Sequence, residues 1–366
     1  MVSLLSCKDY TLEKLREVLT QSFDNLGGVK KHIKPGQKVL LKPNLLMKKT
    51  PEKATTTHPL FVAALAQIII EAGAIVTIAD SPGGFYSENV LKGLYSTCGM
   101  TQAAEISGAT LNYDTSFEEV SYKEGRVSKV FSVIKPVLEA DVVISVAKLK
   151  THGLTTYTGA VKNLFGVVPG KNKAEYHLRF QDIDVFCGAL VDLCEYVSPV
   201  LSFIDGIVGM EGEGPSGGTP REIGAVIASE SPHEADIVAS RLIGLKIDNV
   251  PTLKIAAANG ICSRDVEVVG DEIQPIKDYK MPPNRLSDLS GGRTMKLLGK
   301  MFSPKPVFDK KLCVKCGECV RCCPAKAIEL TPFPKVDMKK CIRCFCCQEL
   351  CPKIAVKIKR MKILEG

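Results

Sequence analysis

The fold of the C-terminal part of this chain is decided by two stretches, CVKCGECVRCCP at Cys313–Pro324 and CIRCFCCQELCP at Cys341–Pro352. Each contains the spacing C-x2-C-x2-C-x3-C-P, and every cysteine of this pattern in the second stretch lies 28 residues after its counterpart in the first. Iron takes thiolate ligands, and such a loop lets three sulfur atoms from one tight turn reach three corners of a cubane. The repeat therefore predicts two [4Fe–4S] clusters.

The two repeats are expected to exchange one ligand each. In two-cluster modules of the bacterial ferredoxin type, the fourth cysteine of each run binds the cluster that the other run holds. The spacing therefore predicts crossed ligand sets. The first set is Cys313, Cys316, Cys319 and Cys351, and the second is Cys341, Cys344, Cys347 and Cys323.

Two other uses of these cysteines fit the spacing less well. Zinc sites also use paired C-x2-C motifs, but they do not account for a third such step that ends in Cys-Pro. Disulfides need an oxidising compartment, and nothing in the sequence suggests export. Cys322 and Cys346 have no cysteine counterpart in the other repeat. They are expected to be spare thiols near the clusters, able to replace a ligand.

Composition describes an ordinary globular chain. Its 366 residues are 45% hydrophobic and 24% charged, enough for a large core and a small additional module. The longest apolar run, Phe61–Ile70, is too short to span a bilayer, and the N-terminus lacks the features of a signal peptide. With reduced cysteines, these features predict a cytoplasmic protein, in an anaerobic setting.

The positive charge is confined to the cysteine-rich part. The formal net charge is +8, and residues 306–366 alone contain 14 Lys and Arg against 6 Asp and Glu. Two clusters with their thiolates would neutralise about half of this excess, and the remainder could steer an acidic redox partner. No nucleic-acid partner is expected, because RNP, zinc-finger and helix-turn-helix signatures are missing.

Before the cysteines, short β-rich runs alternate with amphipathic helical stretches, which is typical of an α/β domain. The run DVVISVA at Asp141–Ala147 is almost continuously apolar, as in a parallel strand that is covered on both faces. We predict an α/β domain with a mostly parallel sheet, followed by a small α+β ferredoxin-like domain. Strands are expected at 38–43, 74–80, 141–147, 200–204 and 223–228, and helices at 11–26, 58–72, 182–197 and 233–243.

Three segments are predicted along the chain. The α/β domain covers 1–273, and a linker or partly helical arm covers 274–304, where Pro and Gly occur among polar and basic residues. The ferredoxin domain covers 305–366. In it, we expect a hairpin built from segments such as 327–330 and 355–358.

The segment 147–179, AKLKTHGLTTYTGAVKNLFGVVPGKNKAEYHLR, is dense in donors and follows a predicted buried strand. In open α/β sheets, ligands bind outside such strand ends. Free backbone N–H groups after Thr158-Gly159 would form an anion cradle beside Lys162. The predicted anion-binding residues are Lys148, Lys150, His152, Thr158 and Asn163, with Lys162 and His177 as catalytic candidates. The alternative is a solvated basic loop.

Acidic residues also follow predicted strands. Asp80 and Asp205 are candidate proton-transfer groups. Glu211 and Glu213 could act in acid–base chemistry or hold a divalent metal, and a flexible acidic loop is the alternative. His32 and His233 are expected at the surface.

Several motifs together resemble a known family: KPNLL, THP, ADSPGG, KTHGLTTYTGAVKNLFGVVPG and DGIVGMEGEGP. The chain is similar to a widespread prokaryotic family described as a domain of unknown function, over about residues 36–300 plus the ferredoxin part. Its most specific stretch is TGAVKN. The resemblance implies two [4Fe–4S] clusters and an anaerobic setting, without a settled substrate. The order of a Lys, a Pro-Gly pair and a later His also resembles a pattern in nickel-pincer lactate racemases. The further histidines of that family have no match in this sequence.

These features favour an iron–sulfur redox protein, with oxidoreductase as the candidate enzyme class. Its clusters would relay electrons to or from an α/β domain that binds an anionic substrate, cofactor or partner. One alternative is a ferredoxin-type carrier that docks on a larger complex and performs no chemistry of its own. Another is a non-redox, racemase-like enzyme with structural clusters. The expected partner is a redox protein or a small anionic molecule.

Overall fold

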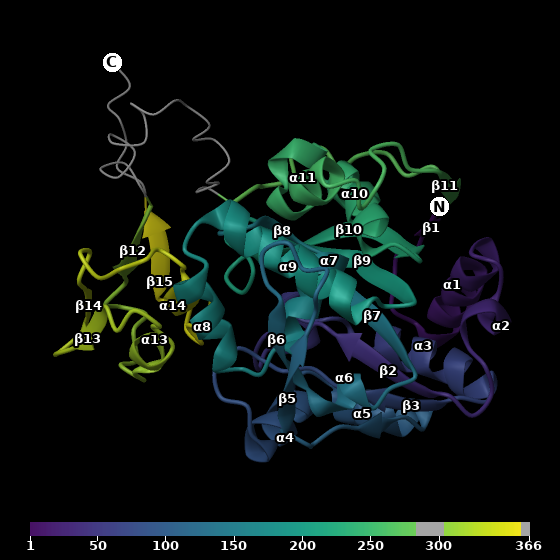
Figure 1. The fold of residues 1–366 in the computed structure, drawn as a ribbon, viewed down its shortest axis with the longest axis horizontal. Coiled ribbons are helices and arrows are strands. Elements are labelled where there is room, and N and C mark those ends of the chain that lie inside the picture. The colour runs from purple at the N-terminus through teal and green to yellow at the C-terminus, as the bar shows by residue number, and fades with distance from the viewer. Residues whose placement is uncertain (283–303, 360–366) are drawn as a thin grey trace.

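The computed structural model describes residues 1–282 and 304–359. A nine-stranded mixed sheet forms the centre of the first domain, in the order β11-β1-β10-β9-β7-β2-β3-β4, with β8 paired to β7 (Figure 1). β2, β3, β4, β7 and β9 run parallel to their neighbours among themselves, whereas β10 is antiparallel to β1 and β9. The strands are β1 Val2–Ser6, β2 Lys38–Pro43, β3 Ile75–Ile78, β4 Thr110–Leu111, β7 Val142–His152, β8 Thr156–Thr158, β9 Leu201–Glu211, β10 Thr219–Ser229 and β11 Val268–Gly270.

Helices cover both faces of this sheet. One face packs on α1, α3, α4 and α5, and the other on α7, α9, α10 and α11, each through its own apolar core. The helices are α1 Leu12–Asn25, α2 Val29–His32, α3 Pro59–Glu71, α4 Glu88–Thr97, α5 Met100–Ser107, α6 Lys135–Leu138, α7 Ala160–Asn163, α8 Asn172–Arg179, α9 Ile183–Val197, α10 Pro232–Leu242 and α11 Pro251–Ala258. The short 3-10 helices are Pro51–Lys53, Leu164–Val167 and Ile247–Asn249, and a separate hairpin joins β5 Phe117–Ser121 to β6 Val130–Ile134.

Local sequence explains where several helices begin and end. α1 starts after Thr11 and ends before Gly27 and Gly28, both of which have positive φ angles that favour glycine. α9 starts at Asp182, whose side chain accepts hydrogen bonds from the backbone N–H groups of Asp184 and Val185. These signals are local, so the sequence was sufficient to predict the helices.

The predicted strands form, but three of them continue further than their apolar runs. β7, β9 and β10 each contain 11 residues, and all 11 residues of β7 are buried. Lys148, Lys150 and His152 therefore belong to a strand and not to a loop. A charged residue is unusual in such a strand unless it is paired, and the pairing partners come from distant parts of the chain.

The C-terminal domain retains the repeat of its sequence. α13 (Glu318–Arg321) and α14 (Cys346–Glu349) begin 28 residues apart, and Lys315 and Arg343 share the same left-handed backbone conformation (φ 57°). β12 (Lys305–Phe308) pairs with β15 (Val356–Lys359), and β13 (Ile328–Leu330) pairs with β14 (Pro334–Val336). The predicted hairpin between 327–330 and 355–358 is therefore wrong, because each segment pairs with its own partner. The predicted fold class, a mostly parallel α/β domain followed by a small cysteine-rich domain, is confirmed.

The predicted linker, 274–304, lies largely on residues 283–303, which are outside the described residues. Its first part packs on the α/β domain, where the Tyr279 hydroxyl donates to the Met210 carbonyl oxygen at 2.7 Å. The domain boundaries 1–273 and 305–366 stay a prediction. Within 1–282 and 304–359, no helix is long and apolar enough to cross a membrane.

The cysteine-rich domain packs directly on the sheet domain, near α8 and α14 (Figure 1). Phe345 is 2% exposed and belongs to the apolar core that contains Phe165 and Phe180. The Ser216 hydroxyl donates to the Glu349 carbonyl oxygen at 2.7 Å. The close approach explains a glycine of the ADSPGG motif, since a Cβ atom at Gly83 would collide with the Leu350 side chain.

Candidate functional site

Two small cavities in the C-terminal domain bring the predicted cysteine sets together. One is lined by Cys313, Cys316, Cys319 and Cys351. The other is lined by Cys323, Cys341, Cys344 and Cys347, together with Cys346. In each cavity, therefore, three cysteines come from one repeat and the fourth from the other.

The chemistry of these cavities fits iron–sulfur clusters. Each cavity contains one predicted set of four thiols, which is the number of ligands that a [4Fe–4S] cluster takes, and the second cavity has Cys346 in addition. Backbone N–H groups point at the sulfur atoms that cross between repeats, from Ala327 to Cys323 and from Ala355 to Cys351, both at 3.2 Å. Such donors stabilise the negative charge of a thiolate. We propose these two sets as the cluster ligands.

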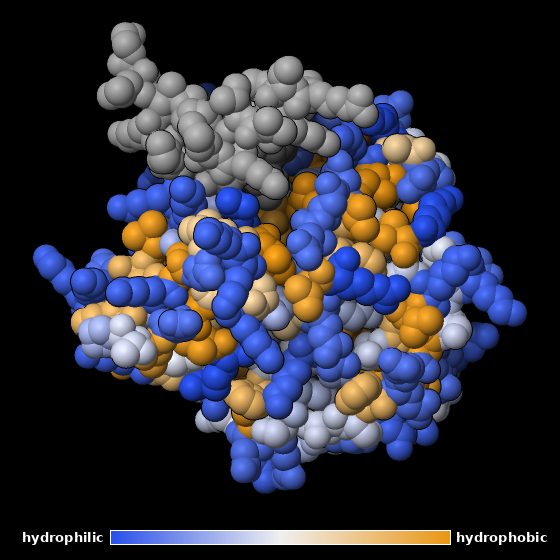
Figure 2. Space-filling model, turned by 60° about the vertical axis from the view of Figure 1, so that its left-hand side comes forward, coloured by the Kyte–Doolittle hydropathy of each residue, from blue (hydrophilic) through white to orange (hydrophobic). Residues whose placement is uncertain are grey.

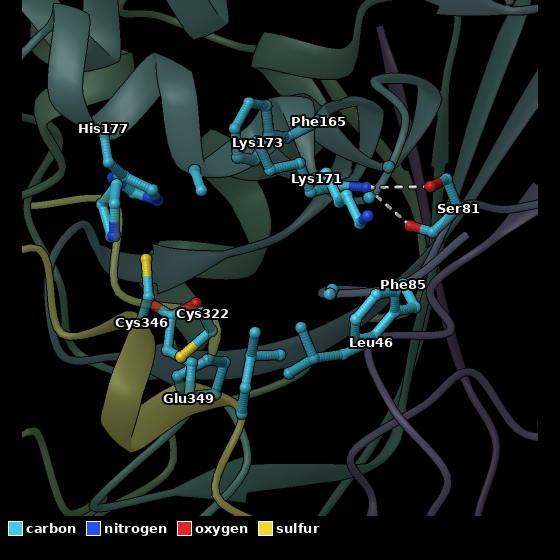
Figure 3. A pocket seen from close by; sticks show the side chains of 18 of the residues that line it. Leu46, Ser81, Phe85, Phe165, Lys171, Lys173, His177, Cys322, Cys346 and Glu349 are labelled. Carbon is cyan, nitrogen blue, oxygen red and sulfur yellow. Dashed lines mark hydrogen bonds between the residues drawn. The ribbon is translucent and has the colours of Figure 1, made fainter. Parts of the chain in front are cut away.

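A third and much larger cavity lies between the two domains. It has a volume of about 360 Å³ and is located at the carboxyl ends of β2, β3 and β7, with α14 closing one side (Figure 3). The chain runs from β2 through β3 to β4 and then returns to β7 on the other side of β2. Ligands of open α/β sheets bind where the strand order reverses in this way.

Both domains contribute to the wall of this cavity. The sheet domain supplies Lys42, Asn44, Leu46, Asp80, Ser81, Phe85, Lys150, His152, Thr158, Lys162, Asn163, Phe165, Lys171, Lys173, His177 and Leu178, among others. The cysteine-rich domain supplies Glu318, Arg321, Cys322, Cys323, Pro324, Lys326, Cys346, Glu349 and Leu350. The cavity therefore combines an unusual number of cations with a member of the second cysteine set.

Buried hydrogen bonds fix the lysines at the floor of the cavity. Lys42 Nζ lies 2.7 Å from Asp80 Oδ1 and 3.0 Å from Asn163 Oδ1. Lys150 Nζ donates to Asn44 Oδ1 at 2.7 Å and to the Thr55 carbonyl oxygen at 2.6 Å. These contacts fix each ammonium group at the end of its strand.

Burial lowers the pKa of two lysines of the cavity, Lys150 and Lys173, so that both lose a proton more easily than an exposed lysine. Burial and the nearby Lys162 ammonium together lower the pKa of Lys150 to about 7. Burial also lowers the pKa of Lys173 to about 7, although Asp80 opposes this shift. Lys173 Nζ donates to the carbonyl oxygens of Ser81 at 2.8 Å and Val168 at 2.6 Å. An anion in the cavity would favour the charged form of both lysines.

Among the polar groups of the cavity, Lys162 Nζ, the His177 ring and Thr158 Oγ1 have no hydrogen-bond partner within the described residues. Lys162 Nζ lies over the ring of Phe165, 5.1 Å from its centroid. His177 stacks on Phe186 at 4.4 Å between ring centroids, and burial lowers its pKa to about 3, so the ring is neutral. These groups are available to a ligand.

His152 connects the strand β7 to the cysteine-rich domain. Its Nδ1 accepts hydrogen bonds from the N–H groups of Leu154 and Thr155 at 3.1 and 3.3 Å. The proton is therefore on Nε2, which lies 3.2 Å from Glu349 Oε1. Burial lowers the pKa of His152 well below its usual value and raises that of Glu349.

Two predicted site residues lie outside this cavity. Lys148 Nζ contacts Asp205 Oδ2 at 2.7 Å, and the Tyr10 hydroxyl donates to Asp205 Oδ1 at 2.7 Å. The N–H of His58 also donates to Asp205, at 3.0 Å. This buried cluster satisfies its own charges, so we exclude Lys148 and Asp205 from the proposed site.

The predicted anion cradle is already filled by a side chain of the protein. The N–H groups of Ala160 and Val161, at the start of α7, donate to the Asp236 carboxylate at 2.6 and 3.1 Å. The hydroxyl of Tyr157 also donates to it, at 3.1 Å. The expectation that these N–H groups are free is therefore wrong, because α10 brings Asp236 to them from 76 residues away.

Several other expectations are also corrected. The segment after residue 147 is not a solvated basic loop, since Lys148 and Lys150 are 1% exposed. Glu213 does not belong to a free acidic loop, because its carboxylate lies 2.6 Å from Lys357 Nζ across the domain contact. His32 and His233 are buried and not at the surface.

The spare thiols lie where the cavity meets the second cysteine set. Cys322 and Cys346 are both buried, and both line the interdomain cavity (Figure 3). Cys346 also lines the cavity of the second set. Neither thiol is needed to complete a set of four, so both remain candidates for spare thiols.

Comparison with known proteins supports this organisation. Residues 39–241 match the family model for a domain of unknown function, DUF362. The chain belongs to the DUF362 family. Residues 305–352 of this DUF362 protein match the model of a 4Fe-4S dicluster domain, which implies two [4Fe–4S] clusters. The resemblance found in the sequence is therefore confirmed.

The thylakoid-associated protein sll1697 of Synechocystis sp. is 35% identical over 289 residues, which cover 77% of this chain and 87% of that protein. Two solved structures are similar at lower levels. The lactate racemase apoprotein from Thermoanaerobacterium thermosaccharolyticum has a TM-score of 0.42 and 12% identity over 66% of this chain. A protein from Thermotoga maritima has a TM-score of 0.37 and 15% identity over 69%. This chain spans 56% and 60% of those two proteins, and neither likeness carries a functional argument.

The crossed ligand sets predict which cysteines act together. Cys313→Ala and Cys351→Ala should each reduce the iron content from about eight to about four atoms per chain and remove the same cluster. Cys323→Ala should remove the other cluster, and Cys322→Ala should leave the iron content unchanged. Iron analysis and EPR spectra of the anaerobically purified, dithionite-reduced variants test this. The assignment is wrong if Cys351→Ala removes the cluster that Cys323→Ala removes.

Asp236 is predicted to stabilise the fold around α7. Asp236→Ala leaves two buried backbone N–H groups and the Tyr157 hydroxyl without their acceptor, so it should lower the free energy of unfolding by about 3 kcal/mol. Urea denaturation measures the effect. Asp248→Ala is the control, since Asp248 pairs with Arg264 at the exposed surface and should contribute little. Equal stabilities of the two variants would contradict the structural role of Asp236.

Proposed function

We propose that this protein is an iron–sulfur redox protein whose C-terminal clusters exchange electrons with an anionic small molecule bound in the interdomain cavity. The observation that carries this proposal is the shared wall of the cavity. Lys42, Lys150 and Lys162 line it from the sheet domain, and Cys323 lines it from the second cysteine set. A ligand held by the lysines would therefore lie next to a proposed cluster ligand.

The residues around the cavity have distinct roles in this proposal. Lys162 and His177 bind the ligand, because both line the cavity and neither side chain has a hydrogen-bond partner within the described residues. Lys150 supplies positive charge and can release a proton near neutral pH. Leu46, Phe85 and Leu350 exclude water and strengthen these electrostatic interactions. When bound, the clusters supply or accept single electrons.

Other features fit a redox role. The cluster domain is joined to the sheet domain by buried polar contacts and an apolar core, so the two parts are held in a defined arrangement. We also propose a reducing, oxygen-poor cytoplasm as the setting, since exposed thiolate loops are prone to oxidation. The name of the Synechocystis relative associates that protein with thylakoids.

The first test is the small-molecule content of the protein. Anaerobically purified protein should carry an anion that heat denaturation releases and mass spectrometry identifies. Lys162→Met should lower its occupancy at least about tenfold, because an uncompensated ammonium contact is lost, while the iron content stays unchanged. Lys246→Met, at an exposed position, is the matched control.

The released compound then separates the proposed function from its alternatives. If dithionite-reduced protein is reoxidised by the compound, or oxidised protein is reduced by it, the redox proposal holds. Cluster oxidation by carrier proteins alone would favour the docking carrier. Conversion of the compound by a folded variant without iron would favour a non-redox enzyme with structural clusters.

Binding of the anion should depend on pH. Lys150 is surrounded by Lys148, Lys162, Asp80 and Glu349, and its pKa is lowered to about 7. It is charged below this value and neutral above it, so affinity should fall as the pH rises from about 6.5 to about 8.5. Equilibrium dialysis with the identified anion measures this dependence. Lys150→Met should bind more weakly and lose the part of the dependence that Lys150 contributes, and the part that remains is assigned to Lys173, whose pKa is also lowered to about 7.

A further inference from the structure

We propose that the surface around the first cysteine set is the docking face for an acidic electron-carrier protein. This face is distinct from the interdomain cavity, which the second cysteine set reaches through Cys323. Among the 15 cysteines, all of which the structure describes, Cys316 of the first set alone is exposed. The chain therefore presents one cysteine set to its own cavity and the other to the outside.

The centre of this face is apolar. Leu312 is 45% exposed and Val314 is 57% exposed, and they flank Cys313 in the loop that carries the first set. Phe333 contacts the same loop, with Lys315 Nζ 4.4 Å from its ring centroid. Exposed aliphatic side chains of this size on a small domain suit contact with another protein.

Four exposed cations lie in or next to the loop that carries this apolar centre. Lys310, Lys311, Lys315 and Lys353 are all exposed, and none of them has an ion-pair partner within the described residues. The acidic neighbour Asp309 uses one oxygen to accept a hydrogen bond from the backbone N–H of Lys311 at 2.8 Å. Such an arrangement fits a partner with an acidic rim and an apolar centre.

The distribution of charge supports the choice of partner. Residues 306–366 carry the whole net charge of the chain, so the field of the protein guides negative molecules towards this domain. The space-filling view shows hydrophobic groups separated by hydrophilic side chains, and not one continuous apolar surface (Figure 2). This pattern favours a transient protein contact over insertion into a membrane.

The proposal does not depend on a substrate in the cavity. A partner docked here would lie against Cys316 and the loop of the first set, whether or not the interdomain cavity holds a ligand. The contact surface is formed by side chains of the chain itself. Binding can therefore be measured separately from any turnover.

The test uses an acidic flavodoxin as the probe and the full-length, cluster-containing protein. Isothermal titration should detect binding at low ionic strength that weakens as salt is raised to about 0.3 M. Lys311→Glu/Lys353→Glu should raise the dissociation constant at least about tenfold. The matched control is Lys339→Glu/Lys340→Glu, which makes the same change of charge near the second set and should alter binding less than about twofold. Leu312→Ser should weaken binding without changing the net charge.

Each outcome decides the proposal. Iron content and EPR spectra must match the wild type in all variants, and Leu312→Ser remains a test if a charge reversal disturbs the fold. If both double variants weaken flavodoxin binding equally, the effect comes from net charge alone, and the proposal of a docking face around the first set is wrong. Absence of flavodoxin binding at low salt would overturn it too. Binding to phosphatidylglycerol vesicles that only Lys311→Glu/Lys353→Glu abolishes, without flavodoxin binding, would assign this face to a membrane.

Discussion

The arrangement of this protein depends on the contact between α14 and the carboxyl end of β7. There the neutral His152 ring, oriented by two backbone N–H groups, lies 3.2 Å from the Glu349 carboxylate. Beside it, Phe345 fills a place in the core of the sheet domain. Without this contact, the cavity would have only one wall, and the second cysteine set would lie away from the lysines of β2 and β7. The proposed function rests on this packing.

Burial of charge is the second constraint. Lys42, Lys148 and Lys150 are almost inaccessible to solvent, so each needs partners that offset the cost of desolvation. Asp205 and Tyr10 both interact with the Lys148 ammonium group, so this lysine has a structural role. Lys162 has aromatic neighbours and a distant carboxylate but no hydrogen bond within the described part of the chain. The contrast indicates which lysine is left for a ligand.

The sequence was sufficient for features that depend on local order. The helix start at Asp182, the helix end before Gly27 and the apolar strands follow from capping and spacing, and the cysteines line two cavities in the groups that their spacing suggests. It was insufficient where distant segments meet. Asp236 fills the expected anion cradle, and Lys42 of β2 meets Lys173 of α8 at the same cavity although the two are 131 residues apart in the chain. Glu349 lies between two of the proposed cluster ligands, and nothing in that position predicts its contact with His152. Such pairings are set by tertiary packing, which the local pattern of residues does not reveal.

The internal duplication of the C-terminal domain has a consequence for its two halves. The sequence repeat is symmetric, but its surroundings are not: Glu349 and Phe345 face the sheet domain, whereas their counterparts 28 residues earlier are Arg321 and Gly317. The first set includes the exposed Cys316, whereas no cysteine of the second set is exposed. Solvent access and nearby charge tune the redox potential of iron–sulfur centres. Two ligand sets of the same chemistry therefore have unequal surroundings, so clusters bound to them would differ in redox potential.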